Sequence, residues 1–165
     1  MKSMLLMRAL ALGLSVATFA AEAQTWPSKP LRAIVPIAPG SMADLAARVV
    51  FEQVSKQLGQ PVIVDNRPGA GQTIGASIVA KSEPDGYTLL VNSSAHAIAP
   101  SLHLNLNYHP ARDFAAVIPL GIVPNVLVVP PAKGWKTVSD LVAAAKAMPG
   151  AMNYASAGVG TATHL

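Results

Sequence analysis

Two glycine-rich segments, each between an expected strand and an expected helix, constrain the fold of this chain more than any other feature. They cover residues 36–44 (PIAPGSMAD) and residues 66–75 (NRPGAGQTIG). A turn of this kind directs backbone N–H groups without intrahelical partners into a cleft, where they can bind an anion. The sequence therefore predicts an α/β fold with anion-binding loops between its strands and helices.

Short apolar runs typical of buried strands alternate with segments of helical periodicity. Ala47, Phe51, Val54 and Leu58 recur at helical spacing on one face, and Gly59 is a typical helix stop. We expect strands at residues 31–37, 61–65 and 87–92 and helices at residues 43–58, 74–81 and 138–148. Residues 137 and 140 (T-x-x-D) have the spacing of a capping box at the start of the last helix. Three further short strands are expected at residues 115–123, 126–129 and 153–155.

This order of elements predicts a mostly parallel sheet with helices on both faces. Ligands of such sheets usually bind at the carboxyl ends of the strands. The two glycine-rich segments, the polar residues 93–96 and a third small-residue turn at residues 156–161 all follow expected strands. We therefore expect these four loops to contribute to one binding site.

The first residues are expected to be an export signal rather than part of the fold. Lys2 and Arg8 are positive, residues 9–19 are apolar, and residues 21–23 (AEA) form an A-x-A cleavage site, so the mature chain would begin at Gln24. The alternative is a membrane anchor, but this apolar run has about half of the ~20 residues that a spanning helix needs. The chain has no cysteine, which excludes a lipid-bearing cysteine and disulfides and favours a bacterial periplasm.

The charge of the chain argues against one class of partner. Removing residues 1–23 leaves 142 residues with a net charge of +3, enough length for one domain with a hydrophobic core. The basic residues are scattered and are not interleaved with aromatic residues, so nucleic acid is not an expected partner. A mildly positive charge is compatible with anionic ligands.

Catalytic and metal motifs are weak. The four histidines have no metal-site spacing and no cysteine is available, so no metal is expected. The chain also has no G-x-S-x-G nucleophile motif, which argues against catalysis. Residues 69–75 resemble the dinucleotide-binding fingerprint G-x-G-x-x-G but contain one residue too many, so they are a weak indication of nucleotide binding. Ser156 and His164 could act as nucleophile and base, although nothing in the sequence places them together. Ser41 and Asp44 also have a structural interpretation, because Ser-x-x-Asp is a variant of the helix capping box.

Several motifs together carry a resemblance to a known family. In chain order they are WPSKP (26–30), P (36), PG (39–40), D (44), NRPGAG (66–71), IG (74–75), PDGYTL (84–89), HAI (96–98), PSL (100–102), DF (113–114), PNVLVV (124–129), NYAS (153–156), G (158), GT (160–161) and HL (164–165). In this order and spacing they resemble the tripartite tricarboxylate transporter substrate-binding receptors, the Bug-type extracytoplasmic solute receptors. The resemblance covers essentially the whole mature chain.

The resemblance implies a type II periplasmic binding protein, in which two α/β lobes joined by crossover strands close on a ligand. Such receptors bind small carboxylates, including di- and tricarboxylates, amino acids and aromatic acids. They deliver the ligand to a membrane permease made of one large and one small subunit. They are not enzymes and need no cofactor, and a monomer is expected.

The family's binding loops carry over to four places in this chain. The implied ligand-binding residues are Pro39, Gly40, Ser41, Asp44, Gly69, Ala70, Gly71, Ser93, Ser94, His96, Ser156, Ala157, Gly158 and Thr161. The chain departs from the family at Ser41 and Gln72, where glycine is usual, and at Ala99, where asparagine is common. Backbone N–H groups and hydroxyls can hold a carboxylate without a buried arginine. Asp44 is expected to orient a water or a ligand donor rather than to touch a carboxylate.

The largest departure of this chain from the family is its length, because family members are about twice as long. We expect residues 1–23 to be the signal peptide, residues 24–123 the N-terminal part of the first lobe, and residues 124–165 the crossover and a truncated beginning of the second lobe. Our hypothesis is that the chain is a fragment. The alternatives are an α/β enzyme, which could depend on a nucleotide, and a receptor fragment without function.

Overall fold

The computed structural model describes residues 25–165. The expected signal peptide and its cleavage site at Gln24 therefore lie outside the described residues. Among residues 25–165, no helix combines the length and the apolar character that crossing a bilayer requires.

A three-stranded parallel sheet forms the centre of the fold. Its strands are β1 (Leu31–Val35), β2 (Val62–Asn66) and β3 (Thr88–Leu90), in the spatial order β2-β1-β3. In the register, Ala33 of β1 lies opposite Val64 of β2 and Leu89 of β3. The central strand is almost fully buried because helices cover the sheet on both sides. The prediction of a parallel sheet built from these three strands is confirmed.

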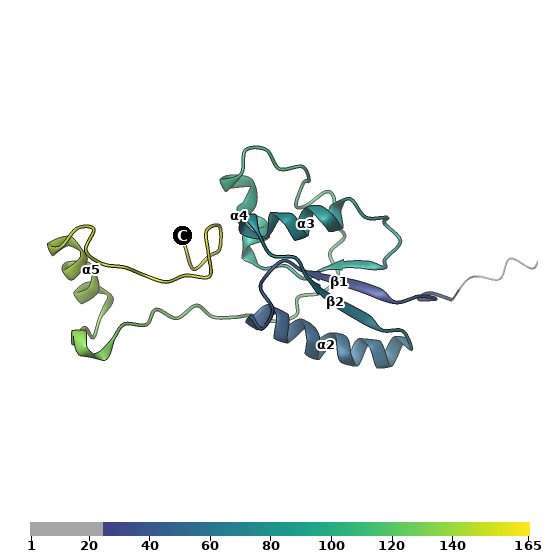
Figure 1. The fold of residues 1–165 in the computed structure, drawn as a ribbon, viewed down its shortest axis with the longest axis horizontal. Helices are drawn as coiled ribbons and strands as arrows, with labels where there is room; N and C mark the ends of the chain where they lie inside the picture. Colours follow the sequence, from purple (N-terminus) through teal and green to yellow (C-terminus); the bar gives the residue numbers. More distant parts are fainter. Residues whose placement is uncertain (1–24) are drawn as a thin grey trace, which may run out of the picture.

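Helices lie on both faces of this sheet, as Figure 1 shows. One face carries α2 (Met42–Leu58), which ends at Gly59 in the left-handed conformation. The opposite face carries α3 (Thr73–Ala80) and α4 (Ser94–Leu102). Phe51 and Ala47 of α2 pack with Ala33 and Val35 of β1 in the main hydrophobic core. The helical periodicity of residues 43–58 therefore correctly identified the side of α2 that faces the sheet.

The sequence did not predict α4. Its first residues read as a polar stretch, and Pro100 lies inside the helix. A proline in a helix interior normally breaks it, because the missing N–H and the ring disturb the preceding turn. Here Pro100 occupies the last turn, and buried Ala95 and Ala99 anchor the helix against the rest of the fold.

Residues 115–130 form an extended segment that leads away from the sheet to η2 (Pro131–Lys133) and α5 (Val138–Ala147), as Figure 1 shows. The predicted capping box of α5 is present: Thr137 Oγ1 accepts the Asp140 N–H, and the Asp140 carboxylate accepts the Thr137 N–H.

The three further strands predicted at residues 115–123, 126–129 and 153–155 are wrong for the described residues. Their apolar side chains are exposed, as Ile122 (96%) and Val128 (80%) illustrate. A strand is stable only when a neighbouring strand satisfies its backbone groups. No such neighbour lies beside these segments within residues 25–165, so their apolar pattern alone does not produce a strand.

Candidate functional site

The loops that follow β1, β2 and β3 meet at one edge of the sheet, because the three strands are parallel. These loops comprise residues 36–41, 67–72 and 91–93. The structure therefore brings together three of the four loops that the sequence singled out.

Asp44 organises the loop after β1. Its side chain is only 2% exposed. Its Oδ2 accepts hydrogen bonds from the Gly40 N–H at 2.9 Å and from Arg48 Nε at 3.0 Å. Its Oδ1 accepts a hydrogen bond from Asn66 Nδ2 at 2.9 Å. Instead of the water or ligand donor expected from the sequence, the Asp44 carboxylate binds three donors of the protein, and the Gly40 N–H is already occupied.

These donors keep Asp44 ionised. The Arg48 hydrogen bond, followed by those of the Gly40 N–H and the Asn66 amide, lowers the pKa of Asp44 to about 2. Ser41 is the N-cap of α2, and its Oγ accepts the Asp44 N–H at 3.4 Å. Both residues therefore have a structural role, which was the alternative interpretation of the Ser-x-x-Asp motif. Pro39 and Gly40 lie exposed beside them.

Residues 69–72, which we call the glycine turn, have positive φ at four consecutive positions. The φ angles are 130° at Gly69, 45° at Ala70, 61° at Gly71 and 78° at Gln72. The Gln72 N–H donates to Gly69 O at 2.9 Å, whereas those of the other three residues have no hydrogen-bond acceptor within the described chain. Successive free N–H groups in a turn of this kind form an anion-binding concavity.

Gln72 and Ser93 connect the glycine turn to the loop after β3. Gln72 is 8% exposed, and its Oε1 accepts a hydrogen bond from Ser93 Oγ at 3.0 Å. Ser93 is also the N-cap of α4, where its Oγ accepts the Ala95 N–H at 3.3 Å. Ser94 begins the helix and is exposed. The two loops are therefore held in a fixed relation by side chains rather than by strand pairing.

His96 packs among aromatic side chains. Its ring stacks with Tyr108 at 5.9 Å and meets the edge of Phe114 at 4.9 Å. Its Nε2 lies 3.0 Å from Pro110 O, and its Nδ1 is buried without a partner. These contacts attach residues 108–114 to α4. The expected ligand contact of His96 remains a prediction.

Residues 156–161, which we call the terminal turn, lie against the glycine turn. A Cβ placed on Gly71 would be 3.3 Å from Val159 O and 3.5 Å from Gly160 Cα. Only glycines allow this approach of the two backbones. Hydrogen bonds close the terminal turn, among them those from Thr161 Oγ1 to Gly158 O and from the Ala157 N–H to Thr163 Oγ1. The fourth predicted loop therefore also reaches the glycine turn.

Ser156 and His164 are adjacent in the structure, although the sequence gave no reason to place them together. Ser156 Oγ lies 2.9 Å from His164 Nδ1, and the Tyr154 hydroxyl lies 3.5 Å from the same nitrogen. No carboxylate pairs with His164 among residues 25–165. Within the same residues, no group of histidine, aspartate and glutamate side chains could hold a metal ion.

Sequence reasoning missed several residues that shape this edge. Asn66 ends β2 and donates to both Asp44 and Ile37 O, while its Oδ1 accepts from Arg48. The available signal was an asparagine at a strand end, followed by Arg-Pro-Gly. His103 Nε2 lies 3.5 Å from the position that a Cβ on Gly71 would occupy. No pattern in the sequence indicated this contact.

Two hollows of about 340 and 260 Å³ lie on the described surface, and neither is lined by a predicted site residue.

Comparison with known protein families identifies the family of this chain. The model of the tripartite tricarboxylate transporter family receptor (TctC) matches residues 46–165. The chain belongs to this receptor family. Among its relatives is BugT of Bordetella pertussis, which is 41% identical over 146 residues that make up 87% of this chain and 45% of BugT.

Two solved structures of similar receptors support the assignment. One is R. palustris Rpa4515 with adipate, at 35% identity and a TM-score of 0.69 over 75% of this chain and 42% of that chain. The other is the periplasmic binding protein BugD, at 40% identity and a TM-score of 0.52 over 54% of this chain and 30% of that chain.

These likenesses confirm the expected family and the α/β periplasmic-binding-protein fold. The family consists of solute-binding receptors rather than enzymes, so the alternative prediction of an α/β enzyme is set aside. The chain spans about half the length of the curated relatives it matches, 47% and 50% for two of them. The lobe boundaries and the site residues stay predictions.

Proposed function

We propose that this chain supplies the carboxylate-binding edge of a periplasmic receptor that captures small carboxylates for a tripartite tricarboxylate transporter. The observation that carries the proposal is the glycine turn, with three consecutive N–H groups that have no acceptor within the described residues. These groups follow β2 at the carboxyl edge of a parallel sheet, where such folds bind ligands. A carboxylate would complete their hydrogen bonding.

The contacts around the turn suit a preorganised site. Gln72 and Ser93 brace it on one side, and Gly160 lies against it on the other. Because the turn is already held in its strained conformation, a ligand would not have to order it on binding. The free-energy cost of binding is therefore lower. Ser94 and Ser156 are the hydroxyls that we propose to add donors around the ligand, together with the other predicted site residues. The Thr161 hydroxyl donates to Gly158 O and would act by holding the terminal turn in place.

The family and one solved relative support the ligand class. The family is named for receptors of tripartite tricarboxylate transporters, and Rpa4515 was solved with adipate, a dicarboxylate. For this chain, we propose a small carboxylate as ligand, a periplasmic location and a transporter permease as partner.

Titration of the full chain with hexanoate, adipate and an uncharged alcohol, 1-hexanol, tests the proposal. We expect a saturable calorimetric signal for at least one carboxylate and none for the alcohol. In amide NMR spectra, the Gly69 and Gly71 resonances should shift first. Absence of binding by every carboxylate to a folded chain would refute the proposal.

A matched pair of variants checks the role of the turn. Gly71→Ala places a Cβ at a φ of +61° and 3.3 Å from Val159 O. We expect it to weaken carboxylate binding at least tenfold. Gly150→Ala is the control, because it adds the same methyl at a φ of +76° with nothing within 4 Å. It should leave the affinity unchanged.

A further inference from the structure

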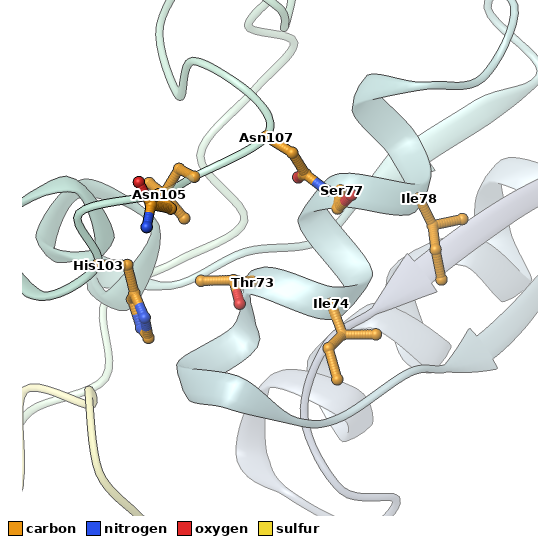
Figure 2. A pocket seen from close by; sticks show the side chains of 8 residues that line it. Thr73, Ile74, Ser77, Ile78, His103, Asn105 and Asn107 are labelled. Carbon is orange, nitrogen blue, oxygen red and sulfur yellow. The ribbon is translucent and has the colours of Figure 1, made fainter.

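Two helices begin side by side at the carboxyl edge of the sheet, and their cap residues are bonded to each other. Gln72 is the N-cap of α3, and Ser93 is the N-cap of α4. The Ser93 hydroxyl donates to Gln72 Oε1 at 3.0 Å, so one hydrogen bond joins the two helix starts. Figure 2 shows Thr73, the first residue of α3, on the side of that helix that faces His103, which follows α4. Because helix N-termini carry partial positive charge, this place favours an anion.

The Gln72 side chain is largely buried, yet half of its amide has no partner. Gln72 is only 8% exposed. A glutamine side chain carries one acceptor oxygen and an NH₂ group with two donors. Its oxygen is paired with Ser93, whereas its nitrogen, Nε2, makes no hydrogen bond within residues 25–165. Since buried polar atoms are almost always paired, Nε2 needs an acceptor from outside the described residues, a water or a ligand.

Nε2 is within reach of such an acceptor. Among the side-chain polar atoms that residues 25–165 enclose completely, only His96 Nδ1 lacks a hydrogen-bond partner. Nε2 of Gln72 also lacks a partner but does not belong to these enclosed atoms, so the small exposed part of Gln72 includes Nε2. The amide is therefore held through its oxygen and open at its nitrogen.

The same hydrogen bond determines which of the two cap residues can donate to a ligand. Ser93 Oγ accepts the Ala95 N–H at 3.3 Å, and its own hydrogen is directed to Gln72 Oε1. A serine hydroxyl has only one hydrogen to donate. The available side-chain donor at this place is therefore the Gln72 amide rather than the Ser93 hydroxyl that the resemblance implies. Glycine, which the resemblance implies at residue 72, would supply no such donor.

We propose that Gln72 is a ligand-binding residue of this receptor and that its Nε2 donates a hydrogen bond to a carboxylate oxygen of the ligand. This inference rests on the proposed function, because the ligand is the same small carboxylate. The starts of α3 and α4 favour the negative charge, and the Ser93 hydrogen bond holds the amide in the orientation that exposes its donors. Because the exposed part of the amide offers donors only, it selects an acceptor oxygen and disfavours an ammonium group.

Gln72→Glu tests this contact by calorimetric titration of the full chain with hexanoate and with adipate. The glutamate keeps an oxygen that accepts the Ser93 hydroxyl, and its negative charge at two helix N-termini favours the fold. A ligand carboxylate at the former position of Nε2 would meet a like charge at close range. We therefore expect the affinity for whichever carboxylate the wild type binds to fall at least about a hundredfold.

Gln57→Glu is the matched control for this substitution. It makes the same chemical change at an exposed position in the last turn of α2, at the end of that helix opposite to the one that begins beside the candidate site. It should leave the carboxylate affinity within about twofold. An equal loss of affinity in both variants would assign the effect to net charge and overturn the contact.

A second measurement uses the wild-type chain and does not depend on the variant. In amide NMR spectra, the side-chain NH₂ signals of Gln72 should shift on addition of the bound carboxylate, whereas those of Gln57 should stay in place. Unchanged Gln72 signals at saturation, or a Gln72→Glu protein that binds as tightly as the wild type, would overturn this inference and leave the proposed function standing. No binding of either carboxylate by the folded wild type would overturn both.

Discussion

Replacing Gly75 with alanine should destabilise the fold, because no space exists for a side chain where α3 crosses the sheet. A Cβ on Gly75 would lie 2.7 Å from Pro36 Cβ, 3.1 Å from Arg67 O and 3.2 Å from Ile34 Cγ2. Carbon atoms in contact prefer about 3.5–4.0 Å, so α3 would have to move outward by about 1 Å. The movement would also displace the glycine turn, which leads directly into α3.

The expected change in the free energy of unfolding is the difference between two opposing effects. Overpacking of this kind costs about 1–3 kcal/mol. Alanine is the better helix former, which offsets about 0.5–1 kcal/mol. The free energy of unfolding should therefore fall by about 1–2 kcal/mol, which lowers the urea midpoint by about 0.5–1 M.

Urea denaturation followed by circular dichroism measures this change. Gly121→Ala is the matched control, because nothing lies within 4 Å of its Cβ position and its φ is not positive. It should change the free energy of unfolding by no more than about 0.5 kcal/mol. A Gly75→Ala protein as stable as the wild type would refute the packing argument.

Three further substitutions test other parts of the chain. The pKa of Asp44 is lowered from 3.8 to about 2, mainly by the Arg48 hydrogen bond, so its carboxylate stabilises the fold above pH 3.8 and this contribution is lost as the pH falls toward 2. The urea midpoint of Asp44→Asn should therefore fall less between pH 3.8 and pH 2 than that of the wild type. Equal decreases in the two proteins would contradict the ion pair. Gly160→Ala places a Cβ 3.2 Å from Gly71 Cα and should shift the amide resonances of the glycine turn, whereas Gly134→Ala, at a φ of +68° with open space around it, should not. Thr137→Ala removes the cap of α5 and should cost that helix about 1 kcal/mol, seen as faster amide exchange in its first turn, with unchanged exchange as the opposing result.

Local chemistry in the sequence was sufficient to predict elements that depend on their own residues. The helix at residues 43–58 was predicted from its apolar spacing and from Gly59, and the structure has α2 at Met42–Leu58. The capping box of α5 needs only Thr137 and Asp140 and was predicted correctly. Whether a strand-like segment finds a partner could not be predicted from local chemistry. Residues 31–35, 62–66 and 88–90 pair in the sheet, whereas residues 115–129 have strand-like composition but no strand beside them within residues 25–165.

In the candidate site, too, some features could be predicted from the sequence and others could not. The parallel order of strands predicted that the loops meet at one edge, because topology alone requires it. The roles of single residues depended on contacts across the fold. Asp44 binds Gly40, Arg48 and Asn66. The first two donors lie four residues from Asp44 in the sequence, whereas Asn66 reaches it only because β2 pairs with β1.

Gln72 shows why a residue that is unfavourable by itself can be favourable in its surroundings. The resemblance to the receptor family implies glycine at this position, and a φ of +78° is one that glycine adopts without steric cost. An L-residue in this conformation costs about 1–2 kcal/mol. The Gln72 side chain gains a buried hydrogen bond to Ser93, worth about 0.5–1.5 kcal/mol, and fills space that glycine would leave empty. The two terms nearly balance, so the substitution costs little stability while it fixes the glycine turn to the loop after β3. Since the free N–H groups of Gly69, Ala70 and Gly71 precede Gln72 directly, we expect this side chain to limit the motion of the turn that we propose to bind a carboxylate.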